Sequence, residues 1–105
     1  MIEILQHDTF KNWLDSIKDA KAKAAIQVRI NRFKLGLLGD VKPIGKGVSE
    51  ARIFVGKGYR LYFIKQGDEI VVLLCGGTKS NKKAQQEDIQ KAINLASELD
   101  RCNDE

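Results

Sequence analysis

The 105-residue sequence contains two cysteines, one proline and one histidine. Cys75 and Cys102 form no CxxC motif, and with the single His7 they indicate neither a disulfide framework nor a zinc site. No apolar run approaches the roughly 20 residues that a membrane-spanning helix needs. The first residues include Glu3 and Asp8, where a secretory signal would need an apolar segment. We therefore expect a cytoplasmic protein without membrane contact, bound metal or cofactor.

The composition that is present is that of a globular protein. Hydrophobic residues make up 43% and charged residues 30% of the chain, which is typical of a folded rather than a disordered sequence. At this length we expect one domain that spans residues 1–105. The formal net charge is +4. A basic surface raises the encounter rate with nucleic acid, although solubility alone can also account for such a balance.

Two amphipathic helices are expected after a short strand at residues 2–5. The first has an apolar stripe at the i, i+3, i+4, i+7 spacing of a helix, formed by Phe10, Trp13, Leu14 and Ile17. Asp8 or Thr9 is expected as its N-cap. The second has its stripe at Ala22, Ile26, Ile30 and Phe33, and Gly36 is expected to stop it. We expect these two helices to form a helical hairpin.

Three strands are expected in the second half of the chain, after a loop-rich segment at residues 36–47. Their expected ranges are 48–55, 59–65 and 69–75. The last strand is apolar on both faces, which predicts a central strand covered on both sides. Gly76 and Gly77 are expected to end it, and a basic loop at residues 78–83 follows. A final helix has its stripe at Ile89, Ala92, Ile93, Ala96 and Leu99. The predicted fold class is α+β, with the helical hairpin and the C-terminal helix on a mainly antiparallel sheet.

The tripeptide Gly56-Lys57-Gly58 is expected to be a three-residue hairpin loop, which pairs Phe54 with Arg60. Residues of equal parity then share a face of the sheet. One face is apolar and includes Ile53, Leu61 and Phe63. The other face collects Glu50, Arg52, Phe54, Arg60, Tyr62 and Ile64. Arginines beside aromatic residues suit the binding of RNA phosphates and bases, and the alternative is a solvated face with surface ion pairs.

Four sequence blocks resemble a known family. They are FKNWLDSIKDAKAKAAI at 10–26, GDVKPIGKGVSEARI at 39–53, GYRLYF at 58–63 and LLCGGTKS at 73–80. In this order and spacing they are similar to the RelE/ParE superfamily of type II toxins, in its HigB/RelE-like addiction module killer protein branch. The resemblance implies the same fold and a ribosome-dependent endoribonuclease, an mRNA interferase that inhibits translation. It also implies three partners, namely the ribosome, mRNA and a silencing antitoxin of the helix-turn-helix or another type.

The resemblance also implies site residues. Arg60 in GYRLYF matches the catalytic arginine of the family, and Arg52 and Lys79 match basic positions on the neighbouring strand and loop. Glu50 is a candidate base or the orienting partner of an arginine. The residues expected to bind RNA or the ribosome are Lys46, Lys57, Lys82 and Lys83.

The chain also departs from the family pattern. Well-known members have a tyrosine or histidine near the C-terminus as a general acid or base, and residues 80–87 contain neither. Since such groups typically contribute about 10²–10⁴-fold to a rate, cleavage would depend on electrostatic catalysis, on Glu50 or on the ribosome. The same fold also allows two other functions, a ParE-like inhibitor of DNA gyrase and a non-catalytic RNA-binding module.

Overall fold

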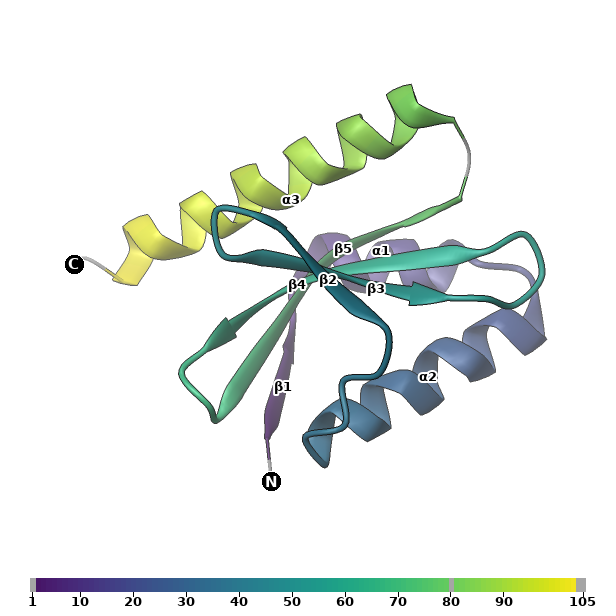
Figure 1. Ribbon diagram of the computed structural model, residues 1–105, viewed down its shortest axis with the longest axis horizontal. Helices are drawn as coiled ribbons and strands as arrows, with labels where there is room; N and C mark the ends of the chain where they lie inside the picture. The colour runs from purple at the N-terminus through teal and green to yellow at the C-terminus, as the bar shows by residue number, and fades with distance from the viewer. Residues whose placement is uncertain (1, 80, 104–105) are drawn as a thin grey trace.

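In the computed structural model, which describes residues 2–79 and 81–103, with side chains up to residue 99, a five-stranded sheet lies between two helical layers (Figure 1). In chain order the elements are β1 Glu3–Gln6, α1 Asp8–Ser16, α2 Ala20–Lys34, β2 Val41–Gly45, β3 Val48–Ile53, β4 Tyr59–Gln66, β5 Ile70–Thr78 and α3 Lys82–Asn103. The strand order is β1-β5-β4-β3-β2. β1 pairs with β5 in parallel and the other neighbouring strands are antiparallel, so the predicted α+β fold is confirmed. Within the described part of the chain, every helix is too short or too polar to cross a membrane.

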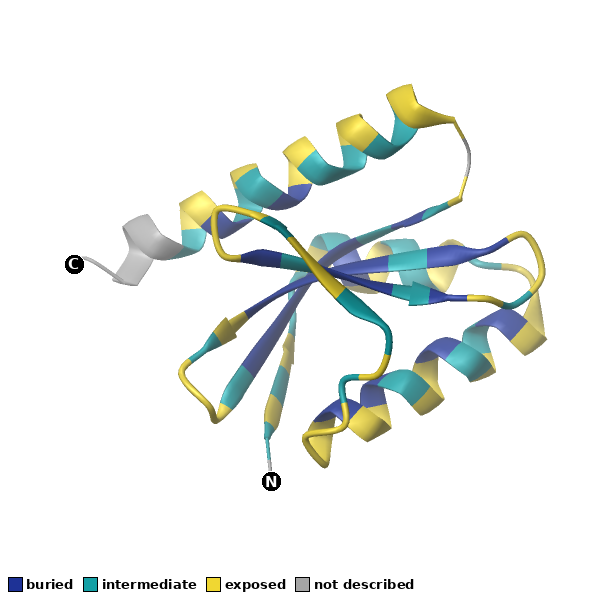
Figure 2. Ribbon diagram, in the orientation of Figure 1, coloured by how far each residue is buried: buried dark blue, intermediate teal, exposed yellow. Residues whose placement is uncertain are grey.

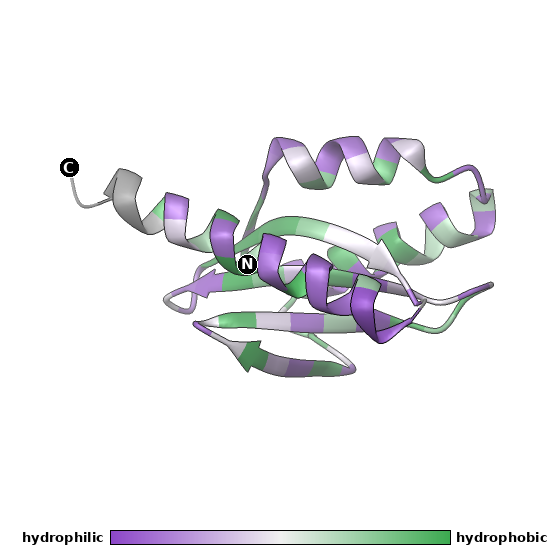
Figure 3. Ribbon diagram, turned by 90° about the horizontal axis from the view of Figure 1, so that it is seen from above, coloured by the Kyte–Doolittle hydropathy of each residue, from purple (hydrophilic) through white to green (hydrophobic). Residues whose placement is uncertain are grey.

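The helices α1 and α2 cover one face of the sheet. Both predicted apolar stripes point inward, and on α2 the buried residues are Ala22, Ile26, Ile30 and Phe33. Phe33 packs on Phe63 of β4 with 5.1 Å between ring centroids. Burial of each such ring contributes about 1.5–3 kcal/mol, so this contact fixes α2 on the sheet. Each helix carries hydrophilic and hydrophobic residues in alternation, as expected when one side is buried (Figure 3).

The ends of α2 are fixed by local hydrogen bonds. The Asp19 carboxylate accepts from the backbone N–H groups of Lys21 and Ala22 at 3.0 and 3.3 Å. At the other end, Gly36 has φ +80°, and its N–H donates to the Phe33 carbonyl at 2.9 Å. The N–H of Leu37 donates to the Arg32 carbonyl at 2.9 Å, which completes a Schellman motif. The predicted stop at Gly36 is confirmed.

The helix α3 covers the opposite face of the sheet. It encloses a second core formed by Val48, Tyr62, Ile64, Val72, Leu74, Cys75, Ala92 and Ala96. On β5, Val71 and Leu73 point to the α1/α2 layer, whereas Val72 and Leu74 point to α3. The prediction that this strand is covered on both sides is confirmed, and Figure 2 shows the buried centre of the sheet with exposed turns around it.

Several predicted boundaries were wrong. Residues 41–45 form the edge strand β2 instead of a loop, because an edge position tolerates Pro43. The N-cap of α1 is His7, whose Nδ1 accepts from the Thr9 N–H at 3.1 Å, rather than Asp8 or Thr9. Lys82 and Lys83 lie in the first turn of α3 and not in a loop. The helix begins early because the Asn81 side chain accepts from the Ala84 N–H at 2.8 Å.

Gly76 and Gly77 do not end β5, which continues to Thr78. A Cβ atom at Gly76 would collide with the Trp13 ring of α1. A Cβ atom at Gly77 would collide with the Asp88 carboxylate of α3 on the other face. The two glycines therefore allow a helix to approach the strand closely on each side.

The predicted pairing of Phe54 with Arg60 was also wrong. β3 and β4 pair Arg52 with Arg60 and Ile53 with Tyr59, so the loop covers residues 54–58. The loop is wider because the Gly58 N–H donates to the Val55 carbonyl at 3.0 Å, and a turn therefore occupies these positions. Both the predicted and the observed loop have an odd number of residues, so the parity of the faces is unchanged. The prediction that Ile53, Leu61 and Phe63 lie in the core is confirmed.

Candidate functional site

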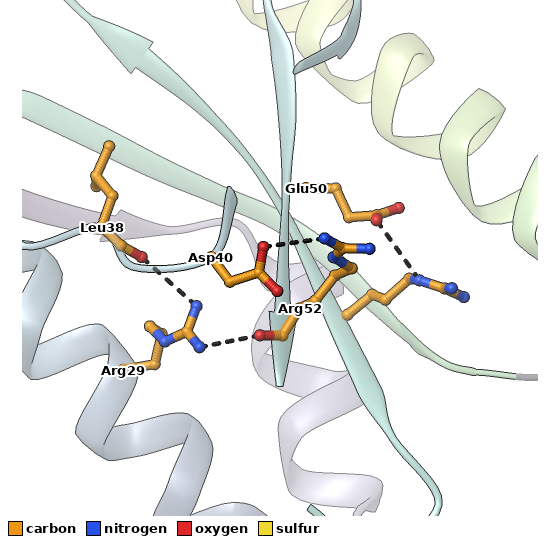
Figure 4. Close-up of polar contacts among 6 residues, drawn as sticks. Arg29, Leu38, Asp40, Glu50 and Arg52 are labelled. Atoms are coloured by element: carbon orange, nitrogen blue, oxygen red, sulfur yellow. Dashed lines mark hydrogen bonds and ion pairs between the residues drawn. The ribbon is translucent and has the colours of Figure 1, made fainter. Parts of the chain in front are cut away.

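Two arginines face each other at the hairpin end of the sheet. Arg52 of β3 is the direct cross-strand partner of Arg60 of β4. Like charges in this arrangement are destabilising unless each has its own counter-charge. Arg52 Nη2 lies 3.0 Å from Asp40 Oδ1, and Arg60 Nε lies 3.6 Å from Glu50 Oε1 (Figure 4). Each guanidinium is therefore held by a separate carboxylate.

A third cation, Lys79, joins the two arginines around one pocket. Arg52, Arg60 and Lys79 all line it, together with the exposed ring of Phe54 and the backbone of Gly58. The Lys79 N–H donates to the Gly58 carbonyl at 3.0 Å. The pocket has a volume of about 50 Å³, far below the roughly 300–1,000 Å³ of small-molecule sites. It can admit a group the size of a phosphate, while a longer ligand would lie across the open surface.

The arginines retain donors for such a group. Among the described residues, the Nε–H groups of Arg52 and Arg60 have no hydrogen-bond partner. The Arg52 guanidinium also lies 5.9 Å from the centroid of the Phe54 ring, within the range of a cation–π contact. Planar guanidinium donors beside an aromatic ring suit a phosphate with an adjoining base.

Arg29 of α2 fixes the strand that carries Arg52. Its Nη2 donates to the Arg52 carbonyl at 2.9 Å, and its Nη1 donates to the Leu38 carbonyl at 3.5 Å (Figure 4). Burial lowers the pKa of Arg29 and the nearby Asp40 carboxylate opposes this effect. The Arg52 N–H in turn donates to the Asp40 carbonyl at 3.1 Å. Sequence analysis missed Arg29 and Asp40, because their contacts with β3 are long-range and leave no local pattern.

Glu50 lies beneath Arg60 and away from the pocket. Its side chain is 2% exposed, and its Oε2 accepts from Gln85 Nε2 of α3 at 3.4 Å. It does not line the cation pocket. Of the two roles considered for Glu50, this geometry fits the orienting partner of Arg60 better than the base.

Two more polar side chains lie between the sheet and α3. The Tyr62 hydroxyl is buried and has no hydrogen-bond partner among the described residues. Burial, and then the charges of Glu50 and Asp88, raise the pKa of Tyr62 well above its ordinary value. The phenol therefore stays protonated at neutral pH, which fits a packing residue rather than a base.

Asp88 lies against Gly77, which is the cross-strand partner of Arg60. Burial raises the pKa of Asp88, while the positive charges of Lys91 and Arg60 oppose this shift. Sequence analysis also missed Asp88. Its signal was the spacing of Gln85, Asp88 and Ala92, which extends the apolar stripe of α3 towards the site.

The four lysines predicted to bind RNA or the ribosome fall into two groups. Lys57 lies next to pocket residue Gly58, and Lys82 and Lys83 follow Lys79 closely in the chain; all three are exposed. Lys46 lies in the β2–β3 turn, just before the end of β3 where Val48 pairs with Ile64. This end is roughly 13 Å along the strand from Arg52. The structure therefore brings Lys57, Lys82 and Lys83 towards the pocket end and leaves Lys46 at the other end.

The remaining reactive groups are not arranged as a site. The Cys75 thiol is buried, and burial raises its pKa to about 12. Such a thiol is a small core residue rather than a nucleophile. Within residues 2–79 and 81–103, no group of three or more histidine, cysteine or carboxylate side chains could hold a metal ion.

Comparison with known proteins places the chain in a family. The family described as "Phage derived protein Gp49-like (DUF891)" matches residues 12–97. A protein of Haemophilus influenzae described as "Uncharacterized protein" is 45% identical over 98 residues, which cover 93% of this chain and 96% of that relative. The family match includes Asp40, Glu50, Arg52, Arg60 and Lys79. Because it covers most of the chain, the protein belongs to the phage-derived Gp49-like family.

Proposed function

We propose that this protein is the toxin of a type II toxin–antitoxin system and that it acts as a ribosome-dependent mRNA endoribonuclease. The observation that carries the proposal is the phosphate-sized pocket lined by Arg52, Arg60 and Lys79. Asp40 and Glu50 hold the two guanidinium groups from behind. The resemblance of the sequence to RelE/ParE toxins and its membership of the Gp49-like family support the same function.

In the proposed reaction a ribose 2′-hydroxyl attacks the adjacent phosphate. A bond forms between the 2′-oxygen and phosphorus, and the bond from phosphorus to the 5′-oxygen of the next nucleotide breaks. The products are a 2′,3′-cyclic phosphate and a 5′-hydroxyl. Negative charge grows on the phosphate oxygens before the leaving group departs. Preorganised cations around a small pocket stabilise such charge, and one donor of this kind typically contributes about 10²–10³-fold in rate.

Two protons also move in this reaction. One leaves the attacking 2′-hydroxyl and one reaches the departing 5′-oxygen. Arg60 and Arg52 stay protonated in proteins and do not accept a proton at neutral pH, and Glu50 is buried beneath Arg60. Under the proposed mechanism, water or ribosomal groups carry these protons while the protein supplies the electrostatic stabilisation. The dependence on the ribosome follows from this division of roles.

A toxin of this type requires an inhibitor in the cell. We expect the cognate antitoxin to bind tightly and to bring acidic residues to a basic surface, because complementary charges speed association and exclude wrong partners. Titration of the purified protein with the product of the neighbouring gene should abolish its activity at one equivalent. Persistent activity at saturation would contradict inhibition by that protein.

The proposed activity is tested by translation in a purified cell-free system. Addition of the protein should stop synthesis and create new 5′ ends within the translated mRNA, and naked mRNA should stay intact. Arg60→Ala should remove these ends, whereas Lys46→Ala at the far end of β3 should retain them. Translation that continues normally, together with inhibition of supercoiling by purified gyrase, would replace this proposal with the ParE-like function. RNA binding without any cleavage would replace it with a non-catalytic module.

A further inference from the structure

The helix α2 has a second apolar stripe on its solvent side. Its buried side packs on the sheet, yet Val28 and Leu35 on the outer side are 47% and 66% exposed. With Ala24 and Asn31 they follow the 4-3-4 spacing of the a and d positions of a coiled-coil seam. Asn31 Oδ1 accepts from Gln27 Nε2 at 3.2 Å, so its amide is partly satisfied on the helix itself. Exposed large apolar residues at seam spacing indicate a surface that a partner covers.

The charges beside this stripe have one sign. The helix carries Lys21, Lys23, Arg29, Arg32 and Lys34 and no acidic residue. At about 100° per residue, Lys21 and Arg32 lie on one flank of the stripe, and Lys23 and Lys34 lie on the other. Arg29 points instead to the Arg52 carbonyl. The outer face of α2 is therefore an apolar seam between two basic margins.

We propose that this face of α2 is the docking surface for an amphipathic helix of a partner protein, whose apolar seam is flanked by aspartate and glutamate. Opposite charges at the margins of a two-helix seam determine partner choice and orientation. A second copy of this chain would place basic margins against basic margins, which costs free energy. Nucleic acid would satisfy the cations and leave Val28 and Leu35 without apolar contact. An acidic helix alone satisfies both the seam and its margins.

The surface is separate from the cation pocket but is connected to it. Val28 and Leu35 are not among the pocket residues. Between them on the same helix, Arg29 donates its hydrogen bond to the carbonyl of Arg52. A partner helix on α2 would therefore bind one side chain away from the strand that carries Arg52. The inference concerns binding, and it holds whether or not the protein cuts RNA.

The probe for this surface is a synthetic peptide of about three heptads, with leucine at its a and d positions and glutamate at e and g. A matched peptide with lysine at e and g is the control. The full-length protein should bind the glutamate peptide saturably in calorimetry and should not bind the lysine peptide. Val28→Asp/Leu35→Asp should weaken binding by about tenfold or more. Arg32→Glu/Lys34→Glu should reverse the preference, so that the lysine peptide now binds more tightly.

Both double variants change exposed positions, so their circular dichroism and melting temperatures should stay close to those of the parent protein. A glutamate peptide that does not bind, or that binds the Val28→Asp/Leu35→Asp variant equally well, overturns the proposal. Concentration-dependent dimerisation that this variant abolishes assigns the face to a second copy and also overturns it. Loss of binding to single-stranded RNA in the same variant, with the peptide inactive, assigns the face to nucleic acid instead.

Discussion

The Glu50 carboxylate lies 3.6 Å from Nε of Arg60, and its side chain is only 2% exposed. A carboxylate at this depth requires a nearby positive charge or hydrogen-bond donors. Arg60 provides the charge, and its own side chain is 14% exposed. Arg60 therefore has two tasks, since it compensates Glu50 inside the fold and presents its guanidinium to the pocket. Substitutions at Arg60 affect both tasks, and a useful experiment separates them.

Arg60→Ala is expected to lower both cleavage and stability. Cleavage should fall by about 10²–10³-fold, because one preorganised donor is removed from the transition state. The free energy of unfolding should fall by about 3 kcal/mol, because Glu50 is left buried without its counter-charge. Single-turnover cleavage on programmed ribosomes and urea unfolding measure the two effects. A protein that keeps its full cleavage rate would remove Arg60 from the proposed chemistry.

The double variant Arg60→Ala/Glu50→Gln is the matched control. A neutral amide at position 50 no longer requires a positive charge, so most of the stability should return while cleavage stays low. Arg60→Lys should retain the charge and remain impaired, because a lysine cannot present the planar guanidinium donors. Recovery of cleavage in the double variant would show that Arg60 acts only through stability.

Asp40 is expected to position Arg52 rather than to stabilise the fold. The pair is 40% exposed on both sides, and exposed pairs contribute only about 0–1 kcal/mol. Asp40→Ala should therefore leave the melting temperature nearly unchanged and lower cleavage by about tenfold, because Arg52 can leave the pocket. Asp40→Glu should recover part of the rate. An equal loss of activity in Asp40→Ala and in Lys42→Ala, on the same edge of the sheet, would argue against a specific role.

The faces of the hairpin could be predicted from the sequence, and its register could not. The alternation of Ile53, Leu61 and Phe63 with charged residues fixes which side chains share a face, since the period of a strand is two. Any loop with an odd number of residues gives the same faces. The choice between three and five residues depends on a turn hydrogen bond at Gly58, which composition does not specify. The prediction of the arginine face therefore survived an error in the pairing.

Contacts between distant segments were the part that sequence analysis could not reach. Arg29 and Asp40 meet Arg52 across 23 and 12 positions of the chain, and neither belongs to a periodic pattern. Lys79 was accessible through family resemblance, which carries such spatial information indirectly. The covering of Glu50 by Gln85 was missed for a similar reason, since it depends on how far α3 extends over the sheet. The site was thus predicted where it lies on strands and missed where loops and helices complete it.

Gly77→Ala is expected to destabilise the protein through a collision with Asp88. Overpacking of this kind typically costs about 1–3 kcal/mol. Because the obstructing group is a carboxylate on α3, Asp88→Ala in the same chain should recover much of the loss. Denaturant unfolding of the two single variants and the double variant measures the coupling between the positions. Strictly additive effects would contradict the contact between Gly77 and Asp88.

Asp88→Asn is expected to stabilise the protein at neutral pH. Burial raises the pKa of Asp88 in the folded state above its unfolded value. The folded state therefore binds this proton more tightly, and the stability linked to it is fully present below the unfolded pKa. That stability disappears as the pH rises through the folded pKa. Urea unfolding across the acidic range should show an advantage for Asp88→Asn that disappears as the pH falls. An advantage that does not depend on pH would mean that the charge of Asp88 is not its cause.

Lys82 and Lys83 are expected to contribute affinity rather than chemistry. Both are exposed in the first turn of α3, close in the chain to pocket residue Lys79. Lys82→Ala/Lys83→Ala should weaken binding to the ribosome and reduce the slope of log affinity against log salt by about 0.7–0.9 for each phosphate that these lysines neutralise. Cleavage should return to the parent rate at saturating ribosome, and Lys46→Ala should match the parent throughout. A double variant that stays slow at saturation, beside an Arg60→Ala protein that cleaves normally, would move the chemistry from the arginine pocket to the start of α3.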